Sequence, residues 1–284
     1  MSYIKLIRPT NWIKNLLIGL PLLLANQFTI NAFIQLIIGF LSFSFLASAG
    51  YILNDIRDVA KDRQHSKKQN RPIANGTVPV DTSFLLAIGM FIAAFLMSAY
   101  LGMEAVTISI IYFVANYFYS VYGKEIRFID ILLLSSFYII RVYFGAAICS
   151  VKLTGWFMAT LTFSVLALSL NKRYMECKNA STQLIPGRGY TKQDEGFLQI
   201  FMVNFAIGAI VLLNIHAYFV LNIQSPLLFV FINIAAVGII LFYFDDSIDK
   251  SDDPVERVIK NKSLLLFLAF FLLLYLYELL MKRT

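Results

Sequence analysis

Long apolar runs recur along the whole chain, and they constrain its fold more than any other feature. Windows of apolar residues long enough to cross about 30 Å of hydrocarbon as α-helix appear from residue 14 to residue 281. Of the 284 residues, 59% are hydrophobic and 14% are charged, whereas soluble domains carry about 25% charged residues. The sequence therefore predicts an all-α, polytopic integral membrane protein.

Nine transmembrane helices are expected from these windows, with short connections between them. They lie near residues 14–30, 32–53, 83–101, 104–122, 129–149, 153–170, 198–221, 226–244 and 263–281. The first window follows a basic start, as in a signal peptide, but a clear small-x-small cleavage site is missing and more spans follow. We therefore expect one membrane domain over residues 1–284.

The basic residues predict the orientation of this domain. Of 24 Lys and Arg residues, all but Arg141, Lys152, Lys282 and Arg283 fall in the segments on the side of the N-terminus, with Lys14 counted at the edge of the first window. The positive-inside rule places that side in the cytoplasm. The formal net charge of +7 is thus explained by topology and anionic substrates, and no nucleic-acid partner is expected.

A polar stretch, "NDIRDVAKDRQHSKKQNRPIANG" at residues 54–76, follows the second window without an intervening proline. If the helix continues through Asp62, then Asn54, Asp58 and Asp62 share one face at about 100° per residue, with Asp55 beside them. On this geometry Arg57 and Lys61 point away from the acidic face. Four oxygen ligands would then lie together at the cytosolic end of a membrane helix.

Carboxylates stacked on one face repel one another, which makes a divalent cation their natural partner. Hard oxygen ligands with room for phosphate oxygens suit Mg²⁺, and a diphosphate would complete its coordination. The following cations Arg63, Lys67, Lys68 and Arg71 could hold phosphate oxygens that the metal does not reach. The alternative is a solvated, charge-balanced loop, against which the i, i+4, i+8 spacing argues.

This stretch resembles the first signature of the UbiA superfamily of intramembrane prenyltransferases, NDxxDxxxD followed by a basic "RP" segment. The matching residues are Asn54, Asp55, Asp58, Asp62 and the pair Arg71-Pro72. The resemblance implies a helical bundle around a central cavity open to the cytosol, Mg²⁺ bound to diphosphate, and a lateral opening for a polyprenyl chain.

The loop after the sixth window departs from the aromatic prenyltransferases of this superfamily. Those proteins carry a second Asp-rich motif there, whereas this chain has "NKRYMECKN" with Lys172, Arg173 and Glu176. The change replaces a metal-mediated phosphate contact with a direct one. Together with "RPTNWIKN", "DILLLSSFYIIRVYFGA" and "DDPVE", it resembles the decaprenyl-phosphate phosphoribosyltransferase branch, although Asn261-Lys262 stands where that branch usually has Asp-Arg.

That branch implies a function: transfer of 5-phosphoribosyl from phosphoribosyl diphosphate to a polyprenyl phosphate, with Mg²⁺, for cell-envelope glycan precursors at the inner membrane of a bacterium. The alternative enzyme is an aromatic or tetrapyrrole prenyltransferase that uses a polyprenyl diphosphate donor. A transporter would need polar groups through the membrane depth, where Arg141 stands nearly alone. The oligomeric state is left open, a homo-oligomer included.

Site residues follow partly from the spacing and partly from the resemblance. The metal is expected on Asn54, Asp58 and Asp62, and catalytic roles on Asp55, Asp58, Asp62 and Asp130. Substrate contacts are expected from Lys14, Asn15, Arg63, Lys67, Arg71, Tyr119, Lys124, Arg141, Lys172, Arg173 and Arg188. Arg141 could equally form a structural ion pair or polar contact between helices, Lys14 could be a topology signal, and Arg188 could belong to a plain loop.

Overall fold

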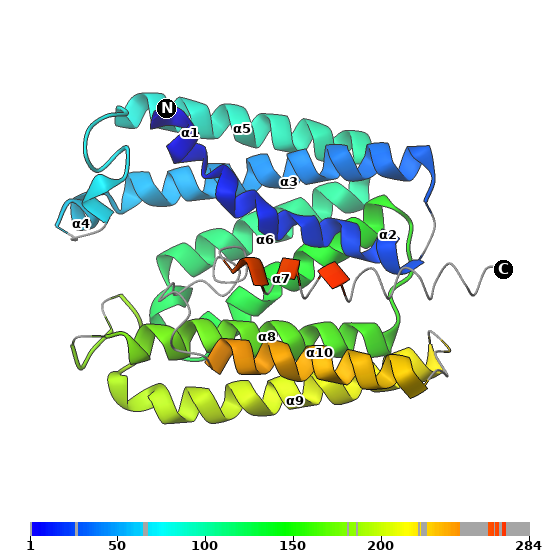
Figure 1. Ribbon diagram of the computed structural model, residues 1–284. Helices are drawn as coiled ribbons and strands as arrows, with labels where there is room; N and C mark the ends of the chain where they lie inside the picture. The colour runs from blue at the N-terminus through cyan, green and yellow to red at the C-terminus, as the bar shows by residue number, and fades with distance from the viewer. Residues whose placement is uncertain are drawn as a thin grey trace. The chain divides into compact units, whose positions relative to one another are not determined.

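The described part of the chain is built from helices (Figure 1). The computed structural model describes residues 2–25, 28–64, 68–180, 182–185, 187–220, 222, 226–244, 261–263, 265–266 and 269–270. The α-helices are α1 (Ser2–Ile7), α2 (Leu20–Ala25), α3 (Ile30–Arg57), α4 (Val59–Arg63), α5 (Val80–Leu101), α6 (Met103–Val121), α7 (Ile129–Ile148), α8 (Gly155–Lys178), α9 (Glu195–Phe219) and α10 (Pro226–Phe244). The 3₁₀ helices are η1 (Pro9–Gly19), η2 (Lys68–Asn70), η3 (Gly123–Glu125) and η4 (Lys192–Asp194). An all-α fold is confirmed for these residues.

Contacts divide the chain into two compact units. The first comprises Met1–Lys124 and Ser136–Leu153, and the second comprises Glu125–Ser135 and Thr154–Thr284. In the first unit α3 packs along α5, and in the second unit α8 packs along α9 (Figure 1). Helix α7 supplies its first residues to the second unit and the rest to the first. A single domain over residues 1–284 stays a prediction.

Five of the predicted membrane spans are long and apolar enough in the structure to cross a bilayer. They are Ile30–Arg57, Val80–Leu101, Met103–Val121, Ile129–Ile148 and Lys192–Phe219. The predicted windows at 153–170 and 226–244 correspond to α8 and α10. Most of the ninth window, 263–281, lies outside the described residues, so the number of nine spans stays a prediction.

The first predicted window, 14–30, is not one α-helix. Its described residues belong to the last part of the 3₁₀ helix η1, to the short α2, and to residues 28–30, where α3 begins. Long 3₁₀ runs are uncommon because their hydrogen-bond geometry is poor, so side-chain contacts must support this one. Asn15 donates to Ser44 Oγ of α3 at 2.9 Å, and Trp12 donates to Ser48 Oγ at 3.0 Å. Two serines one turn apart on α3 thus hold η1 against it.

Local signals explain where several long helices begin. Thr29 caps α3 by accepting a hydrogen bond from Ala32 N at 3.2 Å, and Thr154 caps α8 by accepting one from Phe157 N at 3.2 Å. Such caps satisfy backbone donors that the first turn leaves without partners. Between α5 and α6, Gly102 adopts a φ of 122°, a conformation that favours glycine.

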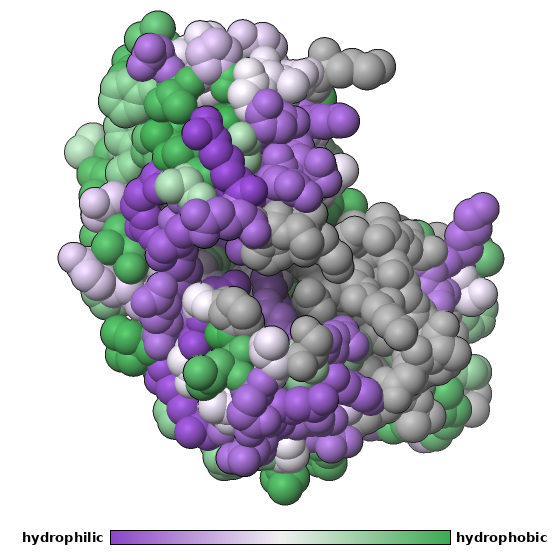
Figure 2. Space-filling view, turned by 90° about the vertical axis from the view of Figure 1, so that its left-hand side faces the viewer, coloured by the Kyte–Doolittle hydropathy of each residue, from purple (hydrophilic) through white to green (hydrophobic). Residues whose placement is uncertain are grey.

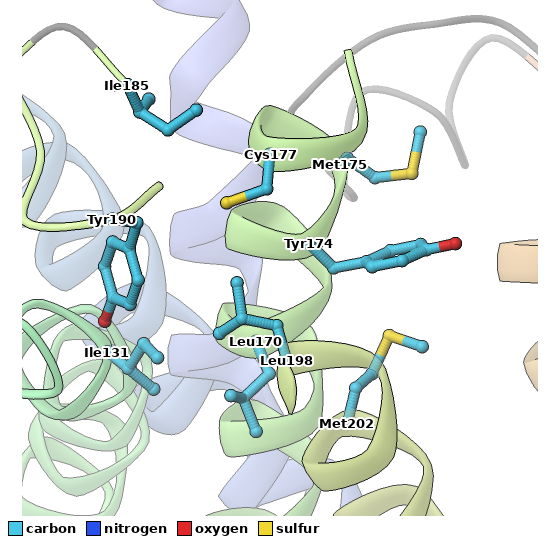
Figure 3. Packing of buried hydrophobic residues seen from close by; sticks show 9 residues of the cluster. All are labelled: Ile131, Leu170, Tyr174, Met175, Cys177, Ile185, Tyr190, Leu198 and Met202. Atoms are coloured by element: carbon cyan, nitrogen blue, oxygen red, sulfur yellow. The ribbon is translucent and has the colours of Figure 1, made fainter. Parts of the chain in front are cut away.

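Each unit has its own hydrophobic cluster. In the first unit the buried members are Leu6, Ala49, Ile52, Ile73, Val78, Ala87 and Met90. In the second unit they are Ile131, Leu170, Tyr174, Met175, Cys177, Ile185, Tyr190, Leu198 and Met202 (Figure 3). The first cluster includes Ile73 and Val78 from the connection between α4 and α5, and the second includes Ile185 and Tyr190 from the connection between α8 and α9. These two connections therefore pack against the core of their units.

Gly145 of α7 lies against the backbone of η1 in the first unit. A Cβ at this position would overlap the carbonyl group of Ile18. Because the obstacle is backbone, rotation of a side chain cannot relieve the overlap. We expect Gly145→Ala to lower the free energy of unfolding by about 1–3 kcal/mol, the usual cost of overpacking, as measured by denaturant unfolding in detergent micelles.

The matched control is Gly89→Ala on α5, where no heavy atom lies within 4 Å of an added Cβ. Alanine favours helix over glycine by about 0.8–1.0 kcal/mol, so this variant should be as stable as the parent protein or more stable. Equal stabilities of the two variants would show that the close approach of η1 to α7 is not required.

Candidate functional site

The acid-rich end of α3 keeps the predicted spacing but not the predicted continuous helix. Helix α3 ends at Arg57, Asp58 has φ −90° and ψ 7°, and α4 begins at Val59. Across this break Asp58 N donates to Asn54 O at 2.9 Å, and Asp62 N donates to Asp58 O at 2.8 Å. The backbone step between Asn54, Asp58 and Asp62 is therefore one helical turn, as the sequence predicts.

Two arginines form ion pairs with two of the acidic side chains of this segment, Asp55 and Asp62. The guanidinium of Arg8 lies 2.7 and 2.6 Å from the two carboxylate oxygens of Asp55. Nη1 of Arg71 lies 2.9 Å from Asp55 Oδ1 and 2.6 Å from Asp62 Oδ2. The side chain of Asp55 is 2% exposed, so its charge is stable only because it is paired.

Asp58 is the more accessible carboxylate of this end, and two cations lie beside it. Lys124 Nζ is 3.2 Å from Asp58 Oδ2, and Arg57 Nε is 3.4 Å from Asp58 Oδ1. Burial on its own raises the pKa of Asp58, but the attraction of Lys124, Arg57 and Lys61 outweighs it, and the pKa lies below its ordinary value. The prediction that Arg57 points away from the carboxylates is wrong, because its long side chain reaches Asp58 from the preceding position.

The remaining predicted residues of this end differ in their surroundings. Arg63 is exposed and donates from Nε to Ala74 O at 3.1 Å, which ties α4 to the connection that follows. Asn54 is half-buried on α3. Lys67 lies outside the described residues. At this end of the first unit, where α4 lies in Figure 1, hydrophilic residues gather on the surface (Figure 2).

The donor set at this end suits a hard divalent cation, because it offers carboxylate and amide oxygens. Among the described residues no group of three or more His, Cys, Asp or Glu side chains is arranged to hold a metal ion. The predicted ligands are two carboxylates and one amide, Asp58, Asp62 and Asn54, so water or substrate oxygens would have to supply the other positions. Assignment of Mg²⁺ to these ligands stays a prediction.

Arg141 of α7 is buried in the first unit among polar and aromatic groups. Its Nε donates to Asn15 Oδ1 at 2.8 Å and its Nη1 donates to Phe137 O at 2.6 Å. The guanidinium also lies 5.2 Å from the ring centres of both Phe43 and Tyr112, close enough for cation–π attraction. These contacts match the structural alternative for Arg141, since they join α7 to η1, α3 and α6.

Lys14 and Tyr119 complete the predicted residues of the first unit. Lys14 precedes Asn15 in η1 and is half-buried. The half-buried ring of Tyr119 packs edge-on against Phe137 at 5.6 Å. Their predicted substrate contacts are not tested by these packing arrangements.

In the second unit, Arg173 of α8 forms the centre of a buried ionic network. Its guanidinium binds both oxygens of Asp130, with Nη2 at 2.9 Å from Oδ1, and it also binds Glu176. Glu176 in turn lies 3.4 Å from Nε of Arg188. The side chain of Arg173 is 1% exposed and that of Asp130 is 0% exposed. Lys172, the preceding residue, is half-buried.

Glu176 is the carboxylate that links α8 to the connection after it. Burial raises its pKa, but the charges of Arg173, Arg188 and Lys172 outweigh burial, so the pKa of Glu176 lies below its ordinary value. Glu176 therefore stays ionised at neutral pH and holds Arg188 near α8. In this structure Arg173 is paired with Asp130 and Glu176. Its contact with a substrate phosphate stays a prediction.

The connection from α8 to α9 is docked on the segment before α7. Phe128 N donates to the hydroxyl oxygen of Tyr190 at 2.9 Å, Arg127 pairs with Asp194, and a Cβ on Gly189 would overlap the carbonyl of Glu125.

Burial raises the pKa of Tyr190 to about 12, so the hydroxyl stays protonated. Burial likewise raises the pKa of the free Cys177 thiol to about 11, which makes it a poor nucleophile.

Sequence reasoning missed Arg8 and gave no specific partner to Glu176. Arg8 precedes Pro9 at the start of the chain, where a basic residue ordinarily reports only membrane topology. It is 47 positions from Asp55, and no local pattern joins them.

The chain matches the model of the UbiA prenyltransferase family over residues 15–243. It is 34% identical over 179 residues to a decaprenyl-phosphate phosphoribosyltransferase of Corynebacterium glutamicum, covering 61% of this chain and 54% of the relative. Identity to the protein of the same name from Mycolicibacterium smegmatis is 32% over 182 residues, covering 62% and 57%. The matched region thus spans little more than half the length of these curated relatives.

Solved structures of low identity share the fold. A UbiA homolog from Archaeoglobus fulgidus, bound to DMAPP and Mg²⁺, has a TM-score of 0.68 and 16% identity, covering 85% of this chain and 88% of that chain. A digeranylgeranylglyceryl phosphate synthase structure has a TM-score of 0.66 and 18% identity, covering 96% and 95%. These matches and the five apolar helices identify an integral membrane protein with the UbiA fold. The chain belongs to the UbiA prenyltransferase family.

Proposed function

We propose that the protein is a Mg²⁺-dependent transferase that moves 5-phosphoribosyl from phosphoribosyl diphosphate to a polyprenyl phosphate of the decaprenyl type and releases diphosphate. The observation that carries the proposal is the chemistry at the end of α8. Where an aromatic prenyltransferase would place acidic metal ligands, this chain places Lys172 and Arg173. Its relatives named decaprenyl-phosphate phosphoribosyltransferase, 34% and 32% identical over matched regions, support the same assignment.

The proposed chemistry needs substrate positioning more than proton transfer. A phosphate monoester has its second pKa near 6, so the lipid phosphate is already a nucleophile at neutral pH. Asn54, Asp58 and Asp62 would hold Mg²⁺. When bound, the ion supplies charge neutralisation for the departing diphosphate.

The cations of the acid-rich end have two roles in this proposal. Lys124 lowers the pKa of Asp58 and so favours its ionised form, and Arg71 and Arg63 bind phosphate oxygens of the donor. Arginine suits this task because its planar fork can bind a phosphate through two hydrogen bonds. Holding both substrates in line for displacement is itself a large part of such catalysis, and a single displacement inverts the anomeric carbon.

The membrane location fits a lipid acceptor and a soluble donor. Phosphoribosyl diphosphate is charged and soluble, whereas the polyprenyl chain partitions into hydrocarbon. The distribution of Lys and Arg supports a site that opens to the cytoplasm from the inner membrane of a bacterium, where the product would feed synthesis of cell-envelope glycans. Transfer of a prenyl group to an aromatic or tetrapyrrole acceptor is the competing reaction.

A direct assay tests the proposal. The full chain in detergent is incubated with Mg²⁺, labelled phosphoribosyl diphosphate and a polyprenyl monophosphate, and label is followed into the organic phase. We expect lipid labelling that chelation of Mg²⁺ abolishes. Absence of labelling, together with transfer of a prenyl group from a polyprenyl diphosphate by the same folded protein, would replace this proposal with prenyl transfer.

Asp58→Asn should lower turnover by at least about 100-fold, because it replaces a predicted metal ligand by an amide and leaves side-chain volume unchanged. Loss of a positioned electrostatic group commonly costs about 10²–10³ in kcat. The control is Asp81→Asn, which neutralises an exposed aspartate in the first turn of α5 and should retain parental activity. Parental turnover by folded Asp58→Asn protein would refute the assignment of Asp58.

Lys124→Met should move the acid limb of the pH profile of kcat/KM to higher pH. Lys124 holds the pKa of Asp58 down, so its removal raises that pKa, and the ionised carboxylate is lost earlier as pH falls. The expected shift is measured against Lys192→Met, a change in η4 of the second unit. An unchanged acid limb would mean that Asp58 does not control the profile.

Arg173→Gln should lower the free energy of unfolding by about 3–5 kcal/mol, because it leaves the buried carboxylate of Asp130 without its cation. The double variant Asp130→Asn/Arg173→Gln removes one charge of each sign and leaves Glu176 with Arg188, so much of the stability should return. Activity of the restored protein then tests the phosphate role of Arg173: parental turnover would limit Arg173 to the ionic network.

A further inference from the structure

Arg71 is shared between two carboxylates that have different functions in the proposed site. Its Nη1 atom lies 2.9 Å from Asp55 Oδ1 and 2.6 Å from Asp62 Oδ2. Asp62 is a predicted metal ligand, whereas Asp55 is the carboxylate that Arg8 also binds. One guanidinium nitrogen therefore connects the metal site to a separate ion pair.

The two carboxylates depend on Arg71 to different extents. Asp55 receives the guanidinium of Arg8 on both of its oxygens, so it stays neutralised when Arg71 leaves. Among the described residues Arg71 is the cation paired with Asp62, whose side chain is almost fully buried. Asp62 thus needs either Arg71 or a replacement cation, since a buried charge without a partner is costly.

Departure of Arg71 from Asp62 requires movement of a side chain alone. The backbone at this point is fixed, because Arg71 N donates to Lys68 O at 3.0 Å and Asn75 N donates to Arg71 O at 2.9 Å. Ile73 and Val78, further along the same connection, are buried in the core of the first unit. The Arg71 side chain, in contrast, is 26% exposed, so its guanidinium has solvent into which it can turn.

We propose that Arg71 is the internal counter-ion of the metal site: it neutralises Asp62 when no metal is bound, and a divalent cation displaces it. Mg²⁺ binds carboxylate oxygens at about 2.0–2.1 Å, and the like charge of a guanidinium at the same oxygen opposes that binding. The displaced guanidinium is then available to phosphate oxygens of the diphosphate donor. The inference rests on the metal assignment in the proposed function.

Metal binding without catalysis tests this role. Isothermal titration with Mg²⁺ alone compares the parent protein with Arg71→Gln, which removes the competing charge. We expect Arg71→Gln to bind Mg²⁺ about tenfold more tightly, equivalent to about 1.4 kcal/mol. In the presence of inorganic diphosphate the advantage should shrink or reverse, because the variant lacks the guanidinium that would hold the phosphate.

Arg8→Gln separates specific competition from a general change in charge. Like Arg71→Gln, this variant removes one positive charge from the acid-rich end of α3. The carboxylate that loses its partner is Asp55, which is not a predicted metal ligand. Specific competition predicts that Arg8→Gln changes Mg²⁺ affinity less than twofold. Equal tightening by Arg8→Gln and Arg71→Gln, or no tightening by a folded Arg71→Gln protein, would overturn the counter-ion role.

A second measurement uses the parent chain and does not depend on a variant that folds. Phenylglyoxal labels accessible arginines, and mass spectrometry reports the extent of labelling at each position. Mg²⁺ should increase labelling of Arg71 severalfold and leave that of Arg8 unchanged, and added diphosphate should then protect Arg71. Labelling of Arg71 that does not respond to Mg²⁺ would contradict the displacement.

These results also distinguish the inference from the proposed function. Mg²⁺ binding with unchanged Arg71 labelling removes the counter-ion role and leaves the transferase assignment intact. No Mg²⁺ binding by the parent or by any variant, with or without diphosphate, overturns the metal assignment and the counter-ion role together. Lipid labelling in the transfer assay tests the transferase activity itself, separately from the metal assignment and from the counter-ion role.

Discussion

A carboxylate buried at the end of a membrane helix sets the arrangement of the first unit. Asp55 is almost inaccessible to solvent, and its charge is held by Arg8 and Arg71 from two other segments. Because an unpaired charge at such a site would cost several kcal/mol, the two arginines fasten the N-terminal segment and the connection after α4 to α3. The left-handed backbone of Arg8, with φ 56°, is a strained conformation that the ion pair with Asp55 and the stacking on Tyr51 offset.

The same constraint organises the second unit with the opposite sign at its centre. There the buried group is the guanidinium of Arg173, and Asp130 and Glu176 surround it. Arg173 is enclosed, whereas Asp58 of the first unit keeps a more accessible carboxylate. The two networks thus differ in what they can offer a ligand: the first combines anionic and cationic groups at a partly exposed end, and the second is mainly internally satisfied.

Local periodicity predicted the part of the structure that depends on local geometry. The spacing of Asn54, Asp58 and Asp62 is preserved in the backbone because one helical turn separates each pair, even across the break at Asp58. The partners of these residues could not be predicted in the same way. Arg8 and Asp55 are 47 positions apart, and helical phase carries no information about a contact made by packing.

Similar reasons explain the other differences from the sequence-based expectations. Apolar content predicted a helical segment at residues 14–30, but the 3₁₀ form of η1 depends on hydrogen bonds to Ser44 and Ser48 of α3. The cationic character of the α8 terminus was evident from the sequence. That Asp130 neutralises Arg173 depends on a contact across 43 positions, which composition does not specify.

If the proposed metal site lies at the acid-rich end, its charge arrangement would favour a metal that arrives with diphosphate over a metal that arrives alone. Asp55, Asp58 and Asp62 each have at least one basic partner within ion-pair distance. A free divalent cation adds positive charge where Lys124 and Arg71 already neutralise the carboxylates, so it must overcome their repulsion. A metal–diphosphate complex would add net negative charge, and the cations displaced from carboxylates in the proposed exchange would gain phosphate oxygens as new partners. Under the proposed function, the basic residues that oppose binding of the bare ion would favour binding of the complex, and the counter-ions would thereby select for the donor.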